Sequence, residues 1–140
     1  MPVLDTSPNV ITYKILIVDD DPNNKEILSL YLRCFNVEIH TASNGHEALD
    51  KVDQINDLSL VIMDINMPLM TGLEACREMK KSRPDLPVII NTAHSTEEDH
   101  QNIFEAGADD SLLKPYRREA FISALNRFIP VRSPTRSNIR

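Results

Sequence analysis

Two short apolar segments of the sequence end abruptly on carboxylic acids. The run Ile15–Val18 is followed directly by Asp19 and Asp20, and the run Leu60–Met63 is followed by Asp64. Four consecutive apolar residues bounded by polar chain are typical of a strand that is buried on both faces. Because an ionised carboxylate is costly to bury, an acid at such a position needs a compensating charge or a chemical role.

Thr92 and Lys114 end two further short segments with strand-like composition. A hydroxyl and an ammonium group that face a carboxylate form a clamp for a phosphoryl group, because both can bind its oxygens. Asp64 would then be the nucleophile and would form an acyl phosphate. Phosphoryl transfer needs little beyond such positioning and charge.

Three carboxylates within about 5 Å of one another repel by roughly 3 kcal/mol per pair at an effective dielectric constant of about 20. They must therefore bind a cation or take up a proton. A hard divalent ion fits best, which means Mg²⁺, with Mn²⁺ as the alternative. A calcium loop that starts at Asp19 is disfavoured because Leu30 stands where its glutamate is needed, and the four histidines form no zinc pattern.

The elements that must position these residues alternate regularly along the chain. The predicted strands are residues 15–18, 37–42, 58–64, 86–93 and 111–114, and the predicted helices are residues 21–35, 44–52, 71–83, 95–107 and 117–129. Such alternation predicts an α/β fold with a parallel sheet and helices on both faces. Ligands bind beyond the carboxyl ends of the strands in such sheets, and this is the edge at which all the acids, the threonine and the lysine would meet.

Local patterns define several helix ends and faces. Asp21 is the expected N-cap of the first helix, and Ser95 with Glu98 has the spacing of a capping box. Apolar spacing predicts the buried face of the first helix at Ile27, Leu30, Tyr31 and Cys34. It places Phe121, Ile122, Leu125, Phe128 and Ile129 on one face of the last helix.

Length and composition indicate one cytoplasmic globular domain. The chain has 140 residues, a formal net charge of -6 and no apolar run of the roughly 20 residues that span a membrane. The negative charge argues against nucleic-acid binding by the domain, and the two cysteines are expected to be free thiols. Residues 1–13 are expected to form a flexible N-terminal arm, and residues 131–140 a basic flexible tail.

Four segments in this order, "ILIVDDD", "LVIMDINMPLMTG", "VIINTA" and "GADDSLLKP", resemble the receiver domain of bacterial two-component response regulators. The resemblance covers about residues 14–130. It implies the flavodoxin-like fold, a doubly wound five-stranded parallel sheet of order 2-1-3-4-5. It also implies a phosphoacceptor module in a phosphorelay, which is not an enzyme beyond its own phosphorylation and dephosphorylation.

The resemblance assigns a role to each position of the site. Asp64 corresponds to the phosphoacceptor, Asp20 to a direct magnesium ligand, and Asp19 to a neighbour that acts mainly through water. Asn66 corresponds to the residue that offers its backbone carbonyl to the metal.

On the same basis, Thr92 and Lys114 correspond to the residues that sense the phosphoryl group, and the Lys114-Pro115 peptide bond is expected to be cis. The phosphodonor would be a phosphohistidine on a histidine kinase or a histidine phosphotransfer protein. Phosphorylation would change contacts with a downstream protein, or dimerisation, through a surface within residues 96–129.

One position departs from the family pattern, and two other functions remain open. Ser111 stands where the family often has an aromatic switch residue, three positions before the lysine. A phosphatase similar to haloacid dehalogenases would use Asp19 as nucleophile and Asp21 as acid/base, but would leave Asp64 unexplained. A receiver fold that serves only as a docking module, without phosphorylation, is the third reading.

Overall fold

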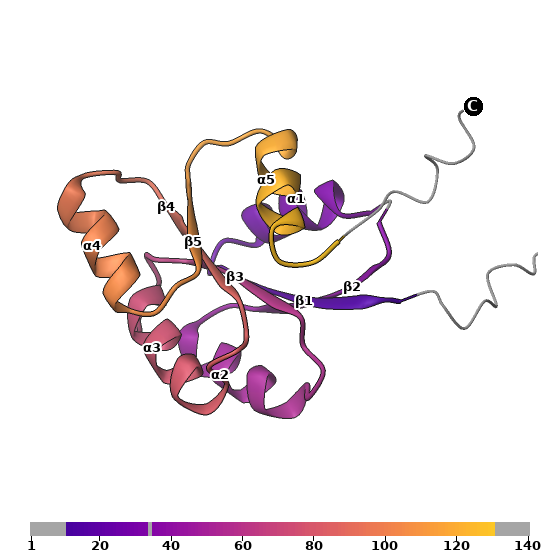
Figure 1. Ribbon diagram of the computed structural model, residues 1–140, viewed down its shortest axis with the longest axis horizontal. Coiled ribbons are helices and arrows are strands. Elements are labelled where there is room, and N and C mark those ends of the chain that lie inside the picture. The colour runs from indigo at the N-terminus through magenta and orange to yellow at the C-terminus, as the bar shows by residue number, and fades with distance from the viewer. Residues whose placement is uncertain (1–10, 34, 131–140) are drawn as a thin grey trace, which may run out of the picture.

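The computed structural model describes residues 11–33 and 35–130, in which five strands alternate with five helices (Figure 1). The strands are β1 (Tyr13–Val18), β2 (Val37–Ala42), β3 (Leu60–Asp64), β4 (Val88–Thr92) and β5 (Asp110–Leu113). The helices are α1 (Pro22–Tyr31), α2 (Gly45–Gln54), α3 (Gly72–Ser82), α4 (Glu97–Glu105) and α5 (Arg118–Asn126). The predicted alternation of strands and helices is confirmed.

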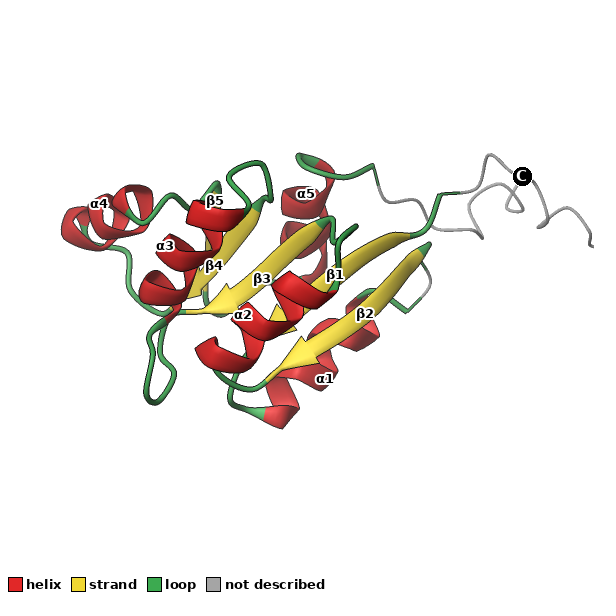
Figure 2. Ribbon diagram, turned by 90° about the horizontal axis from the view of Figure 1, so that it is seen from below, coloured by secondary structure: helices red, strands yellow, loops and turns green. Residues whose placement is uncertain are grey.

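All neighbouring strands pair in parallel, in the order β2-β1-β3-β4-β5. Helices α1 and α5 cover one face of the sheet and α2 and α3 the other, as Figure 1 shows. The arrowheads of β2 and β3 in Figure 2 point toward the side on which α4 lies. The predicted fold class, a doubly wound sheet of order 2-1-3-4-5, is therefore confirmed.

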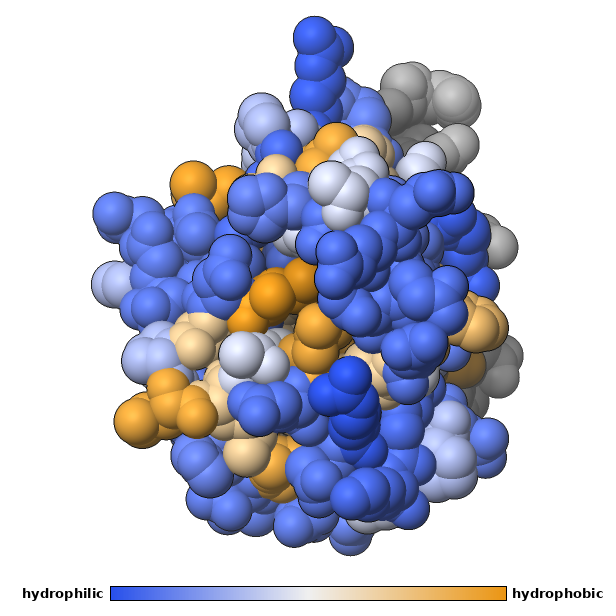
Figure 3. All heavy atoms as spheres, turned by 90° about the vertical axis from the view of Figure 1, so that its left-hand side faces the viewer, coloured by the Kyte–Doolittle hydropathy of each residue, from blue (hydrophilic) through white to orange (hydrophobic). Residues whose placement is uncertain are grey.

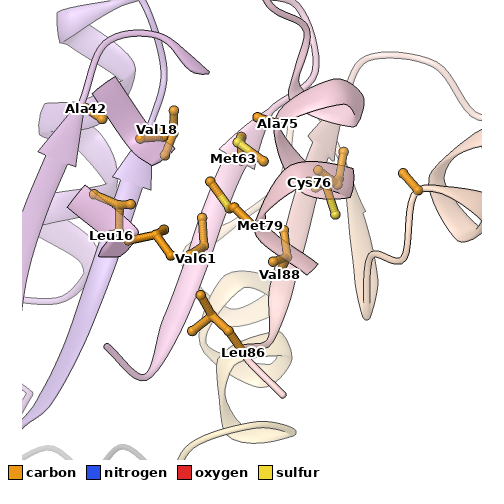
Figure 4. Close-up of a cluster of buried hydrophobic side chains, with 14 of the residues drawn as sticks. Leu16, Val18, Ala42, Val61, Met63, Ala75, Cys76, Met79, Leu86 and Val88 are labelled. Carbon is orange, nitrogen blue, oxygen red and sulfur yellow. The ribbon is translucent and has the colours of Figure 1, made fainter. Parts of the chain in front are cut away.

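β3 and β4 are buried along their whole length and β1 from Ile15 onward, and the side chains of these strands alternate between two cores. Leu16 and Val18 face the core beneath α2 and α3, whereas Ile15 and Ile17 face the core beneath α1 and α5. Figure 4 shows the first of these cores, in which Met79 of α3 packs over the sheet. The same alternation places Asp19 and Asp64, just beyond the apolar runs, on the α1/α5 face.

The predicted buried face of α1 is largely wrong. Leu28 and Leu32 are the buried residues of this segment, and Tyr31 packs beside them, but Ile27 and Leu30 are 45% and 47% exposed. Leucines four positions apart form one stripe of a helix, so the sequence offers two adjacent apolar stripes, and packing against β1 and α5 selects one. The face of α5 is confirmed, because all five of its predicted residues belong to that core.

Most predicted element ends differ from the structure by one or more residues; α1 ends at Tyr31 and α5 at Asn126, short of the predicted residues 35 and 129. The capping box of α4 consists of Thr96 and Asp99, so the predicted box of Ser95 and Glu98 is displaced by one residue. β1 begins at Tyr13, which the prediction had assigned to the arm, because that residue pairs with Val37 of β2. Asp21 is the N-cap of α1, as predicted.

Residues 1–10 of the predicted arm, the whole predicted tail (131–140) and Cys34 lie outside the described residues. Cys76 of α3 is a buried free thiol, and burial raises its pKa to about 11. Within residues 11–33 and 35–130, no helix is long and apolar enough to cross a membrane.

Candidate functional site

Three carboxylates meet at the carboxyl ends of β1 and β3. Oxygen atoms of Asp19, Asp20 and Asp64 all lie within 4.8 Å of one another. Asp19 and Asp64 are only 2% and 6% exposed, whereas Asp20 faces solvent. The structure therefore brings the three predicted acids together, and one of them keeps the cluster open to solvent.

Asp19 is held rigidly at the base of this cluster. Its Oδ1 accepts a hydrogen bond from the Asp21 backbone nitrogen at 2.9 Å, and its Oδ2 accepts one from the side-chain amide of Asn24 at 3.3 Å. Burial raises the pKa of Asp19, and the negative charge of Asp64 raises it further, while the hydrogen bonds and Lys114 oppose the shift. The metal-free site thus disfavours the ionised form of this acid.

Lys114 supplies the positive charge of the site. It follows β5, and its Nζ lies 2.8 Å from Oδ1 of Asp64. Its backbone nitrogen donates to the carbonyl of Thr92 at 2.8 Å, which continues the pairing of β4 and β5 by one residue. The Lys114-Pro115 peptide bond is cis, as the resemblance implied.

The backbone of Asp64 is fixed by a very close approach of α3. A Cβ atom at Gly72 would lie 2.1 Å from the Asp64 carbonyl oxygen, so only glycine permits this contact. The backbone nitrogen of Gly72 donates to the carbonyl of Ile65 at 2.8 Å, and Thr71 closes a capping box with Glu74. The first turn of α3 is therefore packed directly against the backbone that presents Asp64.

The loop between β3 and α3 carries Asn66, which is exposed, and Leu69, which has a left-handed backbone with φ of 74°. Asn66 lies two residues beyond Asp64 in the sequence, and the role predicted for its backbone carbonyl stays a prediction.

Thr92 is buried beside the site but directs its hydroxyl to the loop that leads to α4. Oγ1 donates to the backbone carbonyl of His94 at 3.0 Å and lies 3.1 Å from the His94 nitrogen, from which it accepts. Thr92 therefore couples the end of β4 to this loop. Its hydroxyl must leave these partners to bind a group at Asp64.

Asn91 and Tyr116 lie beside Asp19 and Lys114 and were not recognised from the sequence. Asn91 pairs in register with Asp64 and is only 2% exposed. Burial and the charge of Asp19 raise the pKa of Tyr116, and a side-chain hydrogen bond with Asn91 opposes that shift. A polar residue inside the otherwise apolar "VIIN" run was the signal for Asn91.

The donor set fits a magnesium ion. Its side-chain ligands would be carboxylate oxygens, from the buried Asp19 and Asp64 and the exposed Asp20. Mg²⁺ prefers oxygen ligands and keeps several waters. Within the described ranges, Lys114 is the one cation that pairs with any of these acids, so three carboxylates share one positive charge. Figure 3 shows the molecule from the side toward which β2 and β3 point, where hydrophobic side chains lie in a hollow of a mostly hydrophilic face.

Comparisons with known proteins agree with this geometry. The model of the response regulator receiver domain family matches residues 15–126. Over 121 residues the chain is 34% identical to the response regulator MprA of Mycobacterium sp. (strain KMS), covering 86% of this chain and 52% of that protein. The chain thus spans about half the length of the curated relatives it matches.

Solved structures show the same fold. The chemotaxis protein CheY4 of Vibrio cholerae has a TM-score of 0.79 and 30% identity, over 85% of this chain and all (100%) of that one. The receiver domain of the sensor histidine kinase PA1611 of Pseudomonas aeruginosa, with a magnesium ion coordinated in its active-site cleft, has a TM-score of 0.77 and 27% identity. That match covers 85% of this chain and 98% of the other. The chain belongs to the response regulator receiver domain family, whose members are phosphoacceptors that interact with histidine kinases and downstream effector domains.

Proposed function

We propose that Asp64 is the residue of this receiver domain that accepts the phosphoryl group, with a phosphohistidine of a partner protein as donor. The observation that carries the proposal is the pairing of Asp64 with Lys114 at 2.8 Å inside a cluster of three carboxylates. Asp64 is the acid of this cluster that ends a fully buried strand and has a lysine against it.

In the proposed reaction, a carboxylate oxygen of Asp64 attacks the phosphorus atom while its bond to the imidazole nitrogen of the donor breaks. The histidine nitrogen takes a proton from solvent, and the product is an aspartyl phosphate. Lys114 neutralises charge on the phosphoryl oxygens, because its Nζ already lies at hydrogen-bond distance from the attacking group.

Magnesium would be held by Asp19, Asp20, Asp64 and the backbone carbonyl of Asn66, with manganese as a substitute, and would supply the positive charge that the phosphoryl oxygens need. Two features of the chain prepare this site. Asp19 is fixed by its bonds to the Asp21 backbone and Asn24, and Asp20 leaves one side open to water. The repulsion among the acids favours binding of a cation.

Thr92 is the proposed switch residue. Its hydroxyl bonds the backbone of His94 on both the donor and the acceptor side. When it turns to a phosphoryl oxygen, both bonds to the loop before α4 are lost, and the loop changes its position. Ser111 is half-buried in β5 and carries no ring that could follow this movement, so the proposed switch works through Thr92 alone.

The output is proposed to pass through the predicted surface within residues 96–129, either to a downstream protein or to a second copy of the domain. Phe104 of α4 and Leu113 of β5 are 75% and 49% exposed on this segment and could offer apolar contact to such a partner. The domain is proposed to act on no substrate other than its own aspartate.

The two alternatives are less well supported. A dehalogenase-like phosphatase would need its lysine near the nucleophile Asp19, but the Nζ of Lys114 bonds Asp64. Turnover of a small phosphomonoester would favour that enzyme. A docking module without phosphorylation does not require three clustered acids, two of which are buried at a cost in free energy.

Acetyl phosphate with and without magnesium tests the proposal by intact mass. We expect one magnesium-dependent phosphoryl group on the wild type and none on Asp64→Asn. An unmodified wild type that also fails to bind beryllofluoride would contradict the proposal and favour the docking module.

A further inference from the structure

A partly open cavity of about 300 Å³ lies between α1 and the segment that follows β5. Ile27, Leu28 and Tyr31 of α1 form one wall, and Pro115 and Tyr116 form another. The Tyr116 ring stacks on Phe121 of α5 at 6.0 Å between centroids, so this wall is held by the core. The cavity adjoins the acceptor site, because Asp19 and Lys114 also line it.

Asn91 contributes an unusual polar atom to this cavity. The residue is 2% exposed and lines the cavity, yet its Oδ1 accepts no hydrogen bond from any group in the described ranges. An unsatisfied buried carbonyl oxygen is unfavourable, and the large majority of such atoms in native proteins have a partner. The torsion of an asparagine amide is broad, so rotation of the amide, with loss of its hydrogen bond to Tyr116, can present Oδ1 to a group that enters the cavity.

The charged residues of the cavity already have partners. Asp19 accepts hydrogen bonds on both carboxylate oxygens, and Lys114 pairs with Asp64. An anionic ligand would have to lose its hydration beside Asp19 without gaining a free counter-charge, and the excess negative charge of the acid cluster is already assigned to the proposed magnesium ion. The lining therefore favours an uncharged ligand with one hydrogen-bond donor for Asn91.

Size and shape limit the ligand further. A cavity of about 150 Å³ with apolar walls holds benzene, so about 300 Å³ has room for two fused rings. Two tyrosine rings and the side chains of Ile27 and Leu28 offer aromatic and aliphatic contact. This combination of apolar walls with few polar groups is typical of small-molecule sites.

We propose that this cavity binds an uncharged, planar aromatic molecule of two fused rings whose ring N–H donates to Asn91 Oδ1. The site is separate from the proposed phosphoacceptor chemistry, although it shares a wall with it.

Indole and benzofuran are the probes, because they match in shape but only indole carries an N–H donor. Chemical shifts of the ¹⁵N-labelled full chain are followed during titration, without magnesium or phosphodonor, so the result is independent of the proposed function. We expect the largest shifts at residues around the cavity and about tenfold tighter binding of indole, the value of one net hydrogen bond.

Asn91→Leu keeps the volume of the side chain but removes the acceptor. In this variant indole affinity should fall about tenfold while benzofuran affinity is kept. Ile27→Trp, at a position 45% exposed, should fill the cavity without disturbing the fold and abolish binding of both probes. Equal affinity for the two probes in the wild type, or binding that either variant leaves unchanged, would overturn the proposal, as would shifts located away from the cavity.

Discussion

The Nζ atom of Lys114 lies 2.8 Å from Oδ1 of Asp64, although 50 positions separate the two residues in the sequence. Parallel pairing of β3, β4 and β5 brings the ends of these strands to one edge, and Lys114 follows directly after the last residue of β5. One ammonium group thus faces a cluster of three carboxylates, two of which are buried. The three carboxylates exceed the one ammonium group in charge, so the site can bind a divalent cation as well as a phosphoryl group.

Removal of the Lys114 charge should strengthen magnesium binding. The ammonium group repels a cation at the acid cluster, so Lys114→Met is expected to bind Mg²⁺ roughly tenfold more tightly while it loses phosphorylation. Isothermal titration calorimetry measures the affinity. Lys81→Met is the control, because that lysine pairs with Glu78 on the exposed side of α3. An affinity equal to that of the wild type would show that Lys114 does not act on the metal site.

Loss of the Thr92 hydroxyl should uncouple the acceptor from the loop before α4. In the wild type, beryllofluoride should shift the His94 amide resonance, because Thr92 Oγ1 leaves the His94 backbone. Thr92→Val should show no such shift and should lose about 1 kcal/mol of stability with its hydrogen bonds. Thr92→Ser keeps the hydroxyl and should behave like the wild type. A full His94 response in the valine variant would refute the proposed switch.

Gly72 should tolerate no side chain. Its Cβ would lie 2.1 Å from the Asp64 carbonyl, a backbone atom, so Gly72→Ala is expected to destabilise the protein by about 3 kcal/mol and to slow phosphorylation. Gly45→Ala is a matched control, because there the added atom meets only the flexible side chain of Met70. Urea unfolding should show a change of less than about 1 kcal/mol for the control. Similar losses in both variants would argue against the close approach at Gly72.

Asp19 should make the metal-free protein less stable at neutral pH than at mildly acidic pH. Its folded pKa is raised above the ordinary value of 3.8, so ionisation costs more in the folded than in the unfolded state. In EDTA, the destabilisation that ionised Asp19 causes should therefore decrease as the pH falls from the raised pKa toward 3.8. Asp19→Asn should raise the thermal midpoint in EDTA at pH 7, and the gain should shrink as the pH approaches 3.8. A variant less stable than the wild type at pH 7 would contradict this sign.

Most of the architecture follows from patterns that are local in the sequence. Apolar runs of strand length that alternate with amphipathic segments fix the order of elements, and parallel pairing then brings every strand end to one edge. This is why Asp19, Asp64 and Lys114 could be assigned to one site before their distances were known. The structure supports that assignment with an acid cluster and one ion pair.

The details that sequence patterns missed are choices between options that local spacing leaves equal, or properties of the packed interior. Ser95 with Glu98 and Thr96 with Asp99 have the same capping spacing, and the first pair does not form the box. α1 has two apolar stripes, and its contact with the core buries Leu28 rather than Ile27. The isolated carbonyl of Asn91 could not be predicted, because a missing partner is a property of the folded interior.

The identity of the phosphorylated residue tests the central claim most directly. Borohydride reduces an aspartyl phosphate to homoserine, so the acceptor can be located by peptide mass spectrometry after reaction with acetyl phosphate and magnesium. Homoserine at position 64 is the expected result, with no conversion of the other two acids of the cluster. Homoserine at position 19 would instead favour the dehalogenase-like nucleophile and contradict the role proposed for Asp64.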